Sequence, residues 1–188
     1  MSKLKTLGVF CGGSDGNNPA FLQAGRDLGK ELAEKKIELV YGAGFTGIMG
    51  ALGTSAHENK GRLVGVITNH LQRSERPTFT IDELIIVSSM HLRKDIMFNR
   101  SDAFCILPGG IGTLDELFEI MAMRQIGETN KPIIVANIDG FWDHFNGLLK
   151  ELIKNEFAQE KHEHLVTVVN SVDEVIPTIE RELASLNG

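Results

Sequence analysis

The alternation of short apolar runs with longer amphipathic segments constrains the fold of this chain more than any other feature. The runs predict strands because they are short and are bounded by polar, glycine or proline residues. The predicted strands cover residues 7–11, 37–41, 63–67, 83–87, 103–107, 132–137 and 165–169. Helices are predicted from residue 19, up to residue 59, over 90–100, after 113, over 141–155 and from 172, with residues 68–80 mainly loop.

Strands that alternate with helices throughout a chain form right-handed βαβ units, in which helices cover both faces of a parallel sheet. No linker, repeat or low-complexity segment interrupts the alternation, so we expect a single domain over residues 1–188. The predicted fold is therefore α/β, a doubly wound, Rossmann-like sheet. In such sheets ligands bind at the carboxyl ends of the strands.

Composition narrows the function classes. The chain carries a net charge of −6, which argues against a broad nucleic-acid-binding face, so no nucleic-acid partner is expected. Cys11 and Cys105 lie at or in apolar runs, which is typical of buried free thiols in a reducing compartment. The sequence shows neither a signal peptide nor a membrane-spanning segment. We expect a cytoplasmic protein that does not associate with membranes.

The most informative stretch is Pro-Gly-Gly-Ile-Gly-Thr-Leu-Asp-Glu at residues 108–116, between a predicted strand and a predicted helix. A glycine turn that leads into a helix presents free backbone N–H groups and the positive end of the helix dipole, which together bind anions. Glu116 would lie in the first turn of the helix as a candidate catalytic carboxylate. Thr113 and Glu116 also have the spacing of a capping box, a purely structural role, and the spacing alone does not separate the two interpretations.

A second informative stretch places two cations at the start of a predicted helix over residues 90–100. Arg93 and Lys94 fall in its first turn, where the helix dipole disfavours positive charge. One interpretation is a solvated basic pair on the surface, and the other is that both side chains face an anion. Arg100 is seven residues further on, on the same helical face as Arg93, and is expected to reinforce the positive field. His91 is a weak candidate for an acid–base group.

The other motifs are weaker. Gly42-x-Gly44-x-x-Gly47 has the spacing of a dinucleotide fingerprint, but the next strand ends without the carboxylate that would bind the ribose hydroxyls. No P-loop and no Gly-x-Ser-x-Gly elbow is present. His162 and His164 lack an evident third ligand, so no metal is expected. Ser14, in the glycine loop after the first strand, is a candidate ligand contact.

The pattern Pro-Gly-Gly-x-Gly-Thr-x-x-Glu at residues 108–116, preceded by Met-His-x-Arg-Lys at residues 90–94, closely resembles the motifs of the LOG ("lonely guy") family. Members of that family are cytokinin riboside 5′-monophosphate phosphoribohydrolases and were often mislabelled lysine decarboxylases. The resemblance implies hydrolysis of the N-glycosidic bond of a purine nucleoside 5′-monophosphate, such as AMP or a cytokinin nucleotide, releasing free base and ribose 5-phosphate. It also implies a homodimer and no cofactor, and these residues give no support to pyridoxal phosphate chemistry.

Carried over by position, the resemblance makes Arg93 and Glu116 the catalytic pair. It assigns substrate binding to Glu75, Lys94, Gly110, Ile111, Gly112, Thr113, Leu114 and Asp115. Ser14 joins these candidates because of its place in the first glycine loop. One departure is Ala122, where plant members often carry a threonine that contacts substrate, which bears on the preferred base.

The chemistry is consistent with that assignment, because cleavage of an N-glycosidic bond builds positive charge on the ribose and requires a nearby carboxylate. Glu119, on the same helical face as Glu116, would raise the pKa of Glu116. Two alternatives belong to other classes of protein. A non-catalytic nucleotide-binding carrier or sensor on the same fold would dispense with the Arg–Glu pair, which this chain retains. An NAD-dependent oxidoreductase is disfavoured by the missing ribose carboxylate.

Overall fold

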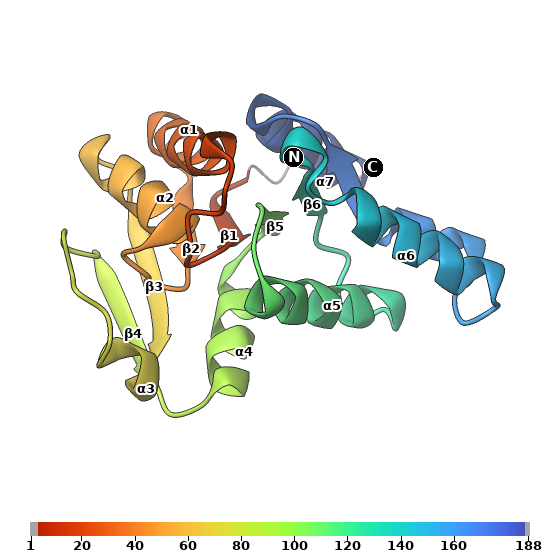
Figure 1. Cartoon of the computed structure of the whole chain (residues 1–188), viewed down its shortest axis with the longest axis horizontal. Helices are drawn as coiled ribbons and strands as arrows, with labels where there is room; N and C mark the ends of the chain where they lie inside the picture. Colours follow the sequence, from red (N-terminus) through yellow and green to blue (C-terminus); the bar gives the residue numbers. More distant parts are fainter. Residues whose placement is uncertain (1–3, 187–188) are drawn as a thin grey trace.

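The computed structural model describes residues 4–186, which build one seven-stranded parallel sheet (Figure 1). The strands are β1 (Thr6–Phe10), β2 (Glu38–Tyr41), β3 (Leu63–Thr68), β4 (Glu83–Val87), β5 (Ala103–Ile106), β6 (Ile133–Ala136) and β7 (Thr167–Val169). Their order in the sheet is β4-β3-β2-β1-β5-β6-β7, and every neighbouring pair is parallel.

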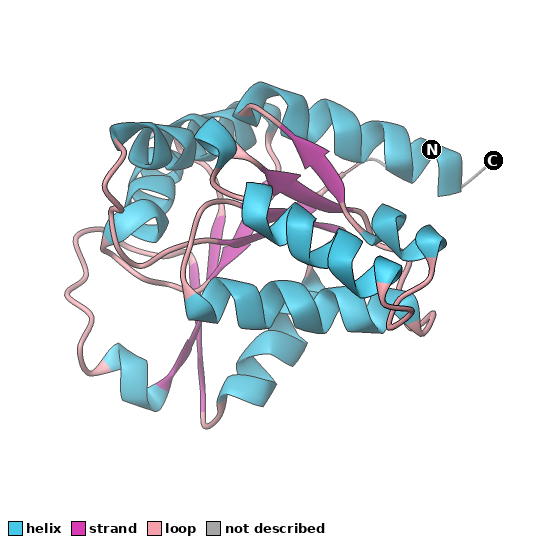
Figure 2. Ribbon diagram, turned by 45° about the vertical axis from the view of Figure 1, so that its right-hand side comes forward, coloured by secondary structure: helices cyan, strands magenta, loops and turns pink. Residues whose placement is uncertain are grey.

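Helices cover both faces of this sheet (Figure 2). They are α1 (Pro19–Lys35), α2 (Gly47–Glu58), α3 (Asn69–Gln72), α4 (Met90–Arg100), α5 (Ile111–Gln125), α6 (Asp143–Lys154) and α7 (Val175–Leu186). Short 3₁₀ turns are η1 (Ile138–Gly140), η2 (Glu160–Leu165) and η3 (Val172–Glu174). The buried side chains form two clusters, one under α1, α2 and α7 and one under α4, α5 and α6. The doubly wound α/β fold expected from the sequence is confirmed.

The sheet reverses its winding direction between β1 and β5. From β1 the chain proceeds outward through β2, β3 and β4, and then returns to pair β5 with the other side of β1. Gly12 N donates to Pro108 O at 3.0 Å, so the two loops that follow β1 and β5 remain hydrogen-bonded where the strands end. Doubly wound sheets bind ligands at this switch point.

Local capping signals explain several helix starts. Asn18 caps α1, and its side chain accepts from Ala20 N at 2.9 Å with Pro19 in the first helical position. Ser89 caps α4 by accepting from Leu92 N at 3.3 Å. Both helices begin where the sequence predicts.

The structure differs from the prediction in two loops. Within residues 68–80, which we predicted to be loop, the one-turn helix α3 forms because Thr68 accepts a hydrogen bond from Leu71 N at 3.3 Å. β7 begins two residues later than expected because the preceding residues form η2. There Gln159 and His162 cap the turn reciprocally, and Gln159 N donates to His162 Nδ1 at 3.0 Å.

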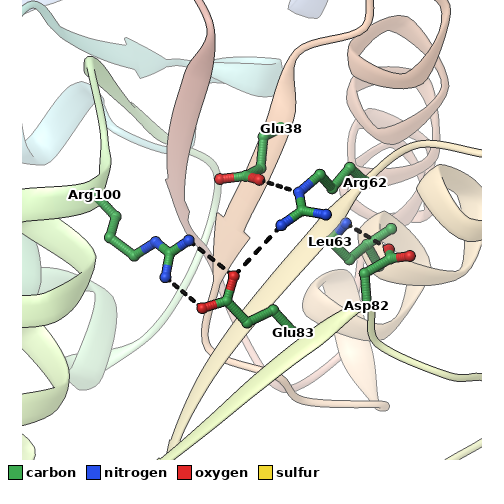
Figure 3. Close-up of polar contacts among 6 residues, drawn as sticks. All are labelled: Glu38, Arg62, Leu63, Asp82, Glu83 and Arg100. Carbon is green, nitrogen blue, oxygen red and sulfur yellow. Dashed lines mark hydrogen bonds and ion pairs between the residues drawn. The ribbon is translucent and has the colours of Figure 1, made fainter.

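At the amino ends of β2, β3 and β4 an alternating ion-pair network joins the strands to α4 (Figure 3). Arg62 bonds Glu38 and lies 3.5 Å from Glu83, which in turn accepts two hydrogen bonds from Arg100. The prediction that Arg100 reinforces the field of Arg93 is wrong. Seven residues advance a helix by roughly 10 Å, which places Arg100 at the opposite end of α4, beside the amino end of the sheet.

Candidate active site

A cavity of about 410 Å³ lies at the switch point, over the carboxyl ends of β1 and β5. Its walls come from the loops after β1, β5 and β6 and from α1, α2, α4 and α5, all converging on one edge of the sheet. This volume lies within the usual range of small-molecule sites. The cavity therefore occupies the position that the fold predicts for a ligand.

The start of α5 forms one wall. Gly110 is the residue before the first turn, and no side chain caps the helix there. The first N–H groups of an uncapped helix lack intrahelical partners and carry the positive end of the dipole. Gly109 allows the approach of this turn, because a Cβ at that position would lie 2.2 Å from Thr113 Oγ1 and 2.9 Å from Gly12 N. The wall offers backbone donors to an anion.

The capping-box interpretation of Thr113 and Glu116 is wrong for this helix. α5 begins at Ile111, so Thr113 is its third residue and Glu116 its sixth, beyond the first turn. Both side chains are buried and line the cavity. Glu116 is therefore free of a capping role and faces the cavity.

Glu116 is only 7% exposed. Burial raises its pKa to about 7; Arg93 and Lys94 lower it, and Asp115 and Glu119 raise it further. The expected effect of Glu119 on this pKa is present but minor, and burial dominates. A carboxyl with a pKa near 7 can exchange protons at neutral pH, as a general acid or base must.

Arg93 faces the same cavity from α4, and its guanidinium is buried. Nε donates to Val66 O at 2.9 Å and Nη2 to Gly42 O at 3.2 Å, while Nη1 lies 3.7 Å from Met90 Sδ. Burial lowers the pKa of Arg93, and the carboxylates of Glu116 and Glu75 partly offset this. Among residues 4–186, none of its contacts is an ion pair shorter than 4.0 Å. The buried cation thus has donors left for a ligand.

Lys94 is buried too, but it belongs to a different cluster. Its ammonium lies 2.9 Å from Asp115 Oδ2 and also pairs with Glu119, both on α5. Burial lowers the pKa of Lys94, but these two carboxylates more than compensate and the pKa is raised. Successive residues of a helix point about 100° apart, so Arg93 and Lys94 face different neighbours. Lys94 joins α4 to α5 and does not line the cavity.

Comparison with known proteins gives the family. A family model described as "Possible lysine decarboxylase" matches residues 49–179. The chain is 36% identical over 179 residues to LOG6 of Arabidopsis thaliana, a probable cytokinin riboside 5′-monophosphate phosphoribohydrolase, covering 95% of this chain and 89% of that protein. It is 37% identical over 184 residues to LOGL9 of Oryza sativa subsp. japonica, which bears the same description, covering 94% and 81%. The chain belongs to the LOG family.

Solved structures place the LOG chain within a broader fold group. A molybdenum cofactor binding protein of Rippkaea orientalis superposes with a TM-score of 0.71 at 20% identity, covering 97% of this chain and 99% of that one. The Moco carrier protein of Chlamydomonas reinhardtii gives 0.70, also at 20% identity, with the same coverage. At this identity the likeness shows a shared fold and nothing about ligands.

The structure brings some of the candidate site residues into the cavity and leaves others outside. Those that line it are Arg93, Glu116, Ser14, Gly110, Gly112 and Thr113. Those outside it are Glu75, Lys94, Ile111, Leu114, Asp115 and Ala122. Ile111 is 81% exposed. Glu75 does not line the cavity and accepts a hydrogen bond from Phe45 N at 3.0 Å.

Several cavity-lining residues of this LOG protein were not identified from the sequence. Phe21 and Phe141 form an edge-to-face pair at 5.3 Å, and Met49 and Met90 line other parts of the cavity. They come from separate loops and helices, and apolar residues at helix starts give no functional signal in a single sequence. Cys11 also lines the cavity; burial chiefly, and then Glu116, raises the pKa of its thiol, which keeps it protonated.

Residues 4–186 contain neither a cluster of metal ligands nor a helix that could span a membrane. Within that range, no three His, Cys, Asp or Glu side chains cluster so as to hold a metal ion. His91 is exposed on α4 and does not line the cavity. None of the described helices is long and apolar enough to cross a bilayer.

Proposed function

We propose that this LOG protein hydrolyses the N-glycosidic bond of a purine nucleoside 5′-monophosphate, with a cytokinin-type base or adenine, to give free base and ribose 5-phosphate. The observation that carries the proposal is the pair of buried, oppositely charged groups, Arg93 and Glu116, in one cavity beside an uncapped helix start. The relatives that are more than a third identical over most of the chain are described as phosphoribohydrolases, which supports the same reaction.

The start of α5 suits the 5′-phosphate of such a substrate. Gly110, Gly112 and Thr113 line the cavity there, and Ser14 lies across from them in the loop after β1. Backbone N–H groups and a helix dipole bind a phosphate without a lysine, which accounts for a nucleotide site that lacks a P-loop. The phosphate would orient the ribose toward Glu116.

Glu116 would act at the ribose. As the bond between C1′ and the base nitrogen breaks, its electron pair leaves with the base and positive charge develops on the sugar ring. The ionised Glu116 carboxylate stabilises that charge and takes a proton from the water that adds to C1′. Return of that proton to the departing nitrogen gives the neutral free base and restores the carboxylate. Arg93 keeps part of the Glu116 population ionised and offers its remaining N–H donors to negative charge on the substrate.

The test is release of ribose 5-phosphate and free base from a panel of purine 5′-monophosphates that includes AMP and N6-isopentenyl-AMP. We expect release by the wild-type protein and loss of release in Glu116→Gln. Release should persist in Glu119→Gln, a charge-matched change one turn along α5 and outside the cavity, because the ion pair of Lys94 with Asp115 still holds α4. Tight nucleotide binding without release would instead favour the carrier or sensor, a function borne by proteins of this fold such as the Chlamydomonas carrier.

We also infer a homodimer, because apolar side chains are exposed on α4 and α5 next to the cavity. Leu92 is 48% exposed, Ile111 81% and Phe118 38%. Burial of such side chains against a second copy would remove apolar surface from water. Light scattering should give twice the chain mass for the wild type and a monomer for Ile111→Asp/Phe118→Asp; a wild-type monomer would contradict the inference.

A cytoplasmic location also remains our proposal. It is supported by Cys11 and Cys105, which are free and buried, as is usual where thiols stay reduced. The expected partner is the small-molecule substrate, with no nucleic acid and no membrane.

A further inference from the structure

The Gly42-x-Gly44-x-x-Gly47 turn after β2 resembles a dinucleotide fingerprint but has no part in the mechanism above. In the structure its first glycine touches Arg93. Gly42 O accepts the hydrogen bond from Nη2 at 3.2 Å, and the space where a side chain would begin is already filled. A Cβ on Gly42 would lie 2.0 Å from Nη2 and 3.1 Å from Met49 Sδ.

Backbone conformation does not require glycine at this position. Among the described residues the glycines with positive φ are Gly16, Gly47, Gly127 and Gly140. Gly42 is not one of them, so an alanine can adopt its backbone angles. The requirement is therefore for space, and the group that uses the space is the guanidinium of Arg93.

The guanidinium has no easy way to move aside. Its Nε is bonded to Val66 O at 2.9 Å, in β3, while Nη2 is bonded to Gly42 O, just after the neighbouring strand β2. Two carbonyls, one in β3 and one just after β2, fix the plane of the guanidinium, which is a rigid fork of donors. The side chain is also buried, so displacement would break bonds that water does not replace.

We propose that Gly42 is a positioning residue for the LOG reaction. Because Gly42 has no side chain, the guanidinium of Arg93 fits against the backbone at the ends of β2 and β3, with its free donors directed into the cavity. The glycine spacing of this turn then reflects packing against Arg93 and the neighbouring loop. In agreement with this, a Cβ on Gly47 would lie 2.3 Å from the backbone of Gly13 and Ser14.

The first test uses the pKa of Glu116 to detect movement of the Arg93 guanidinium, without relying on turnover. Carbon-13 NMR of the glutamate carboxyls, with Glu116 assigned by its loss in Glu116→Gln, gives the pKa of Glu116 in each variant. Arg93 and Lys94 lower this pKa, whereas burial, Asp115 and Glu119 raise it. Gly42→Ala should move the guanidinium away and raise the pKa of Glu116, as should Arg93→Met. An unchanged pKa in folded Gly42→Ala would overturn the proposal.

The catalytic consequence rests on the proposed function and is measured separately. We expect kcat of Gly42→Ala to fall by about 100-fold with a smaller change in KM, because misplacement of a reacting group by about 1 Å has effects of that size. If Gly42→Ala raises the pKa of Glu116 but keeps the wild-type kcat, only the expected catalytic effect is refuted. Absence of hydrolysis by the wild type would refute the proposed function and leave the NMR test standing.

Gly8→Ala is a matched control, because it adds the same methyl group at another buried glycine. Gly8 is buried in β1, three residues before Cys11 of the cavity, and also has no positive φ. Its Cβ would lie 2.6 Å from Ser101 Oγ, which does not line the cavity. Gly8→Ala should lower stability without moving the Glu116 pKa. If Gly42→Ala folds poorly, Gly42→Ala/Arg93→Ala should be more stable than Gly42→Ala, since the methyl then has room. If the double variant is no more stable than Gly42→Ala, the proposal that Gly42 leaves room for Arg93 is contradicted.

Discussion

Replacement of Glu116 by glutamine should abolish turnover and, at alkaline pH, stabilise the folded protein. Burial raises the pKa of Glu116 from 4.5 to about 7, so the folded state resists ionisation of this carboxyl. At 1.36 kcal/mol per pKa unit, the ionised carboxylate costs about 3 kcal/mol of folding free energy. Glutamine has nearly the same shape and no charge, and removes that cost.

The sign follows from which state binds the proton more tightly. Below pH 4.5 the carboxyl is neutral in both folded and unfolded chains, and the substitution should change stability little. As the pH rises from 4.5 through about 7, the unfolded chain ionises first and the wild type loses stability that the variant keeps. Urea denaturation at pH 4 and pH 9 should therefore show a stabilisation only at pH 9.

Glu119→Gln provides the control for this experiment, because the Glu119 carboxylate pairs with the buried ammonium of Lys94. Its removal should lower stability at pH 9, opposite in sign to Glu116→Gln. A Glu116→Gln variant that is equally destabilised at both pH values would refute the reasoning. That result would mean that Glu116 holds the structure together through contacts that do not depend on its charge and that glutamine does not reproduce.

Three further outcomes follow from the same contacts. The kcat/KM of the wild type should fall as the pH drops through about 7, where Glu116 becomes protonated, and a flat profile between pH 5 and 8 would contradict its role as the ionised group. Lys94→Met should lower stability by about 1–2 kcal/mol in urea denaturation, less than for a fully buried pair, because Asp115 and Glu119 can be solvated. Gly109→Ala should raise KM in steady-state kinetics and change the free energy of unfolding only slightly, since its methyl would displace Thr113 at the proposed phosphate site.

The fold was predictable because it depends on the spacing of apolar residues, which marks strands and helices along the whole chain. Strand β4 was predicted to the residue, and α1 and α4 at their starts, where apolar spacing and a capping residue agree. The errors occur where a few local hydrogen bonds decide. α3 depends on one threonine, and the late start of β7 depends on the cap between Gln159 and His162.

The candidate site was predictable only in part, for a different reason. Glycine turns and charges at helix starts signal an anion site, and Arg93 and Glu116 do face one cavity. Sequence spacing does not show which way each side chain of a helix turns relative to a distant element. The diverging directions of Arg93 and Lys94, and the aromatic wall formed by Phe21 with Phe141, depend on packing between elements far apart in the chain.

The cavity explains which positions of the motif at residues 108–116 are fixed in residue type and which are not. Its specified positions, Pro108, Gly109, Gly110, Gly112, Thr113 and Glu116, all line the cavity, whereas its unspecified positions, Ile111, Leu114 and Asp115, do not. Thr113 and Glu116 share a face because residues three apart on a helix are neighbours. Asp115 and Glu119, which do not line the cavity, instead hold Lys94 and so fix α4, which carries Arg93. One helix thus supplies the carboxylate of the site and, through ion pairs outside the cavity, helps to orient the helix that supplies the guanidinium.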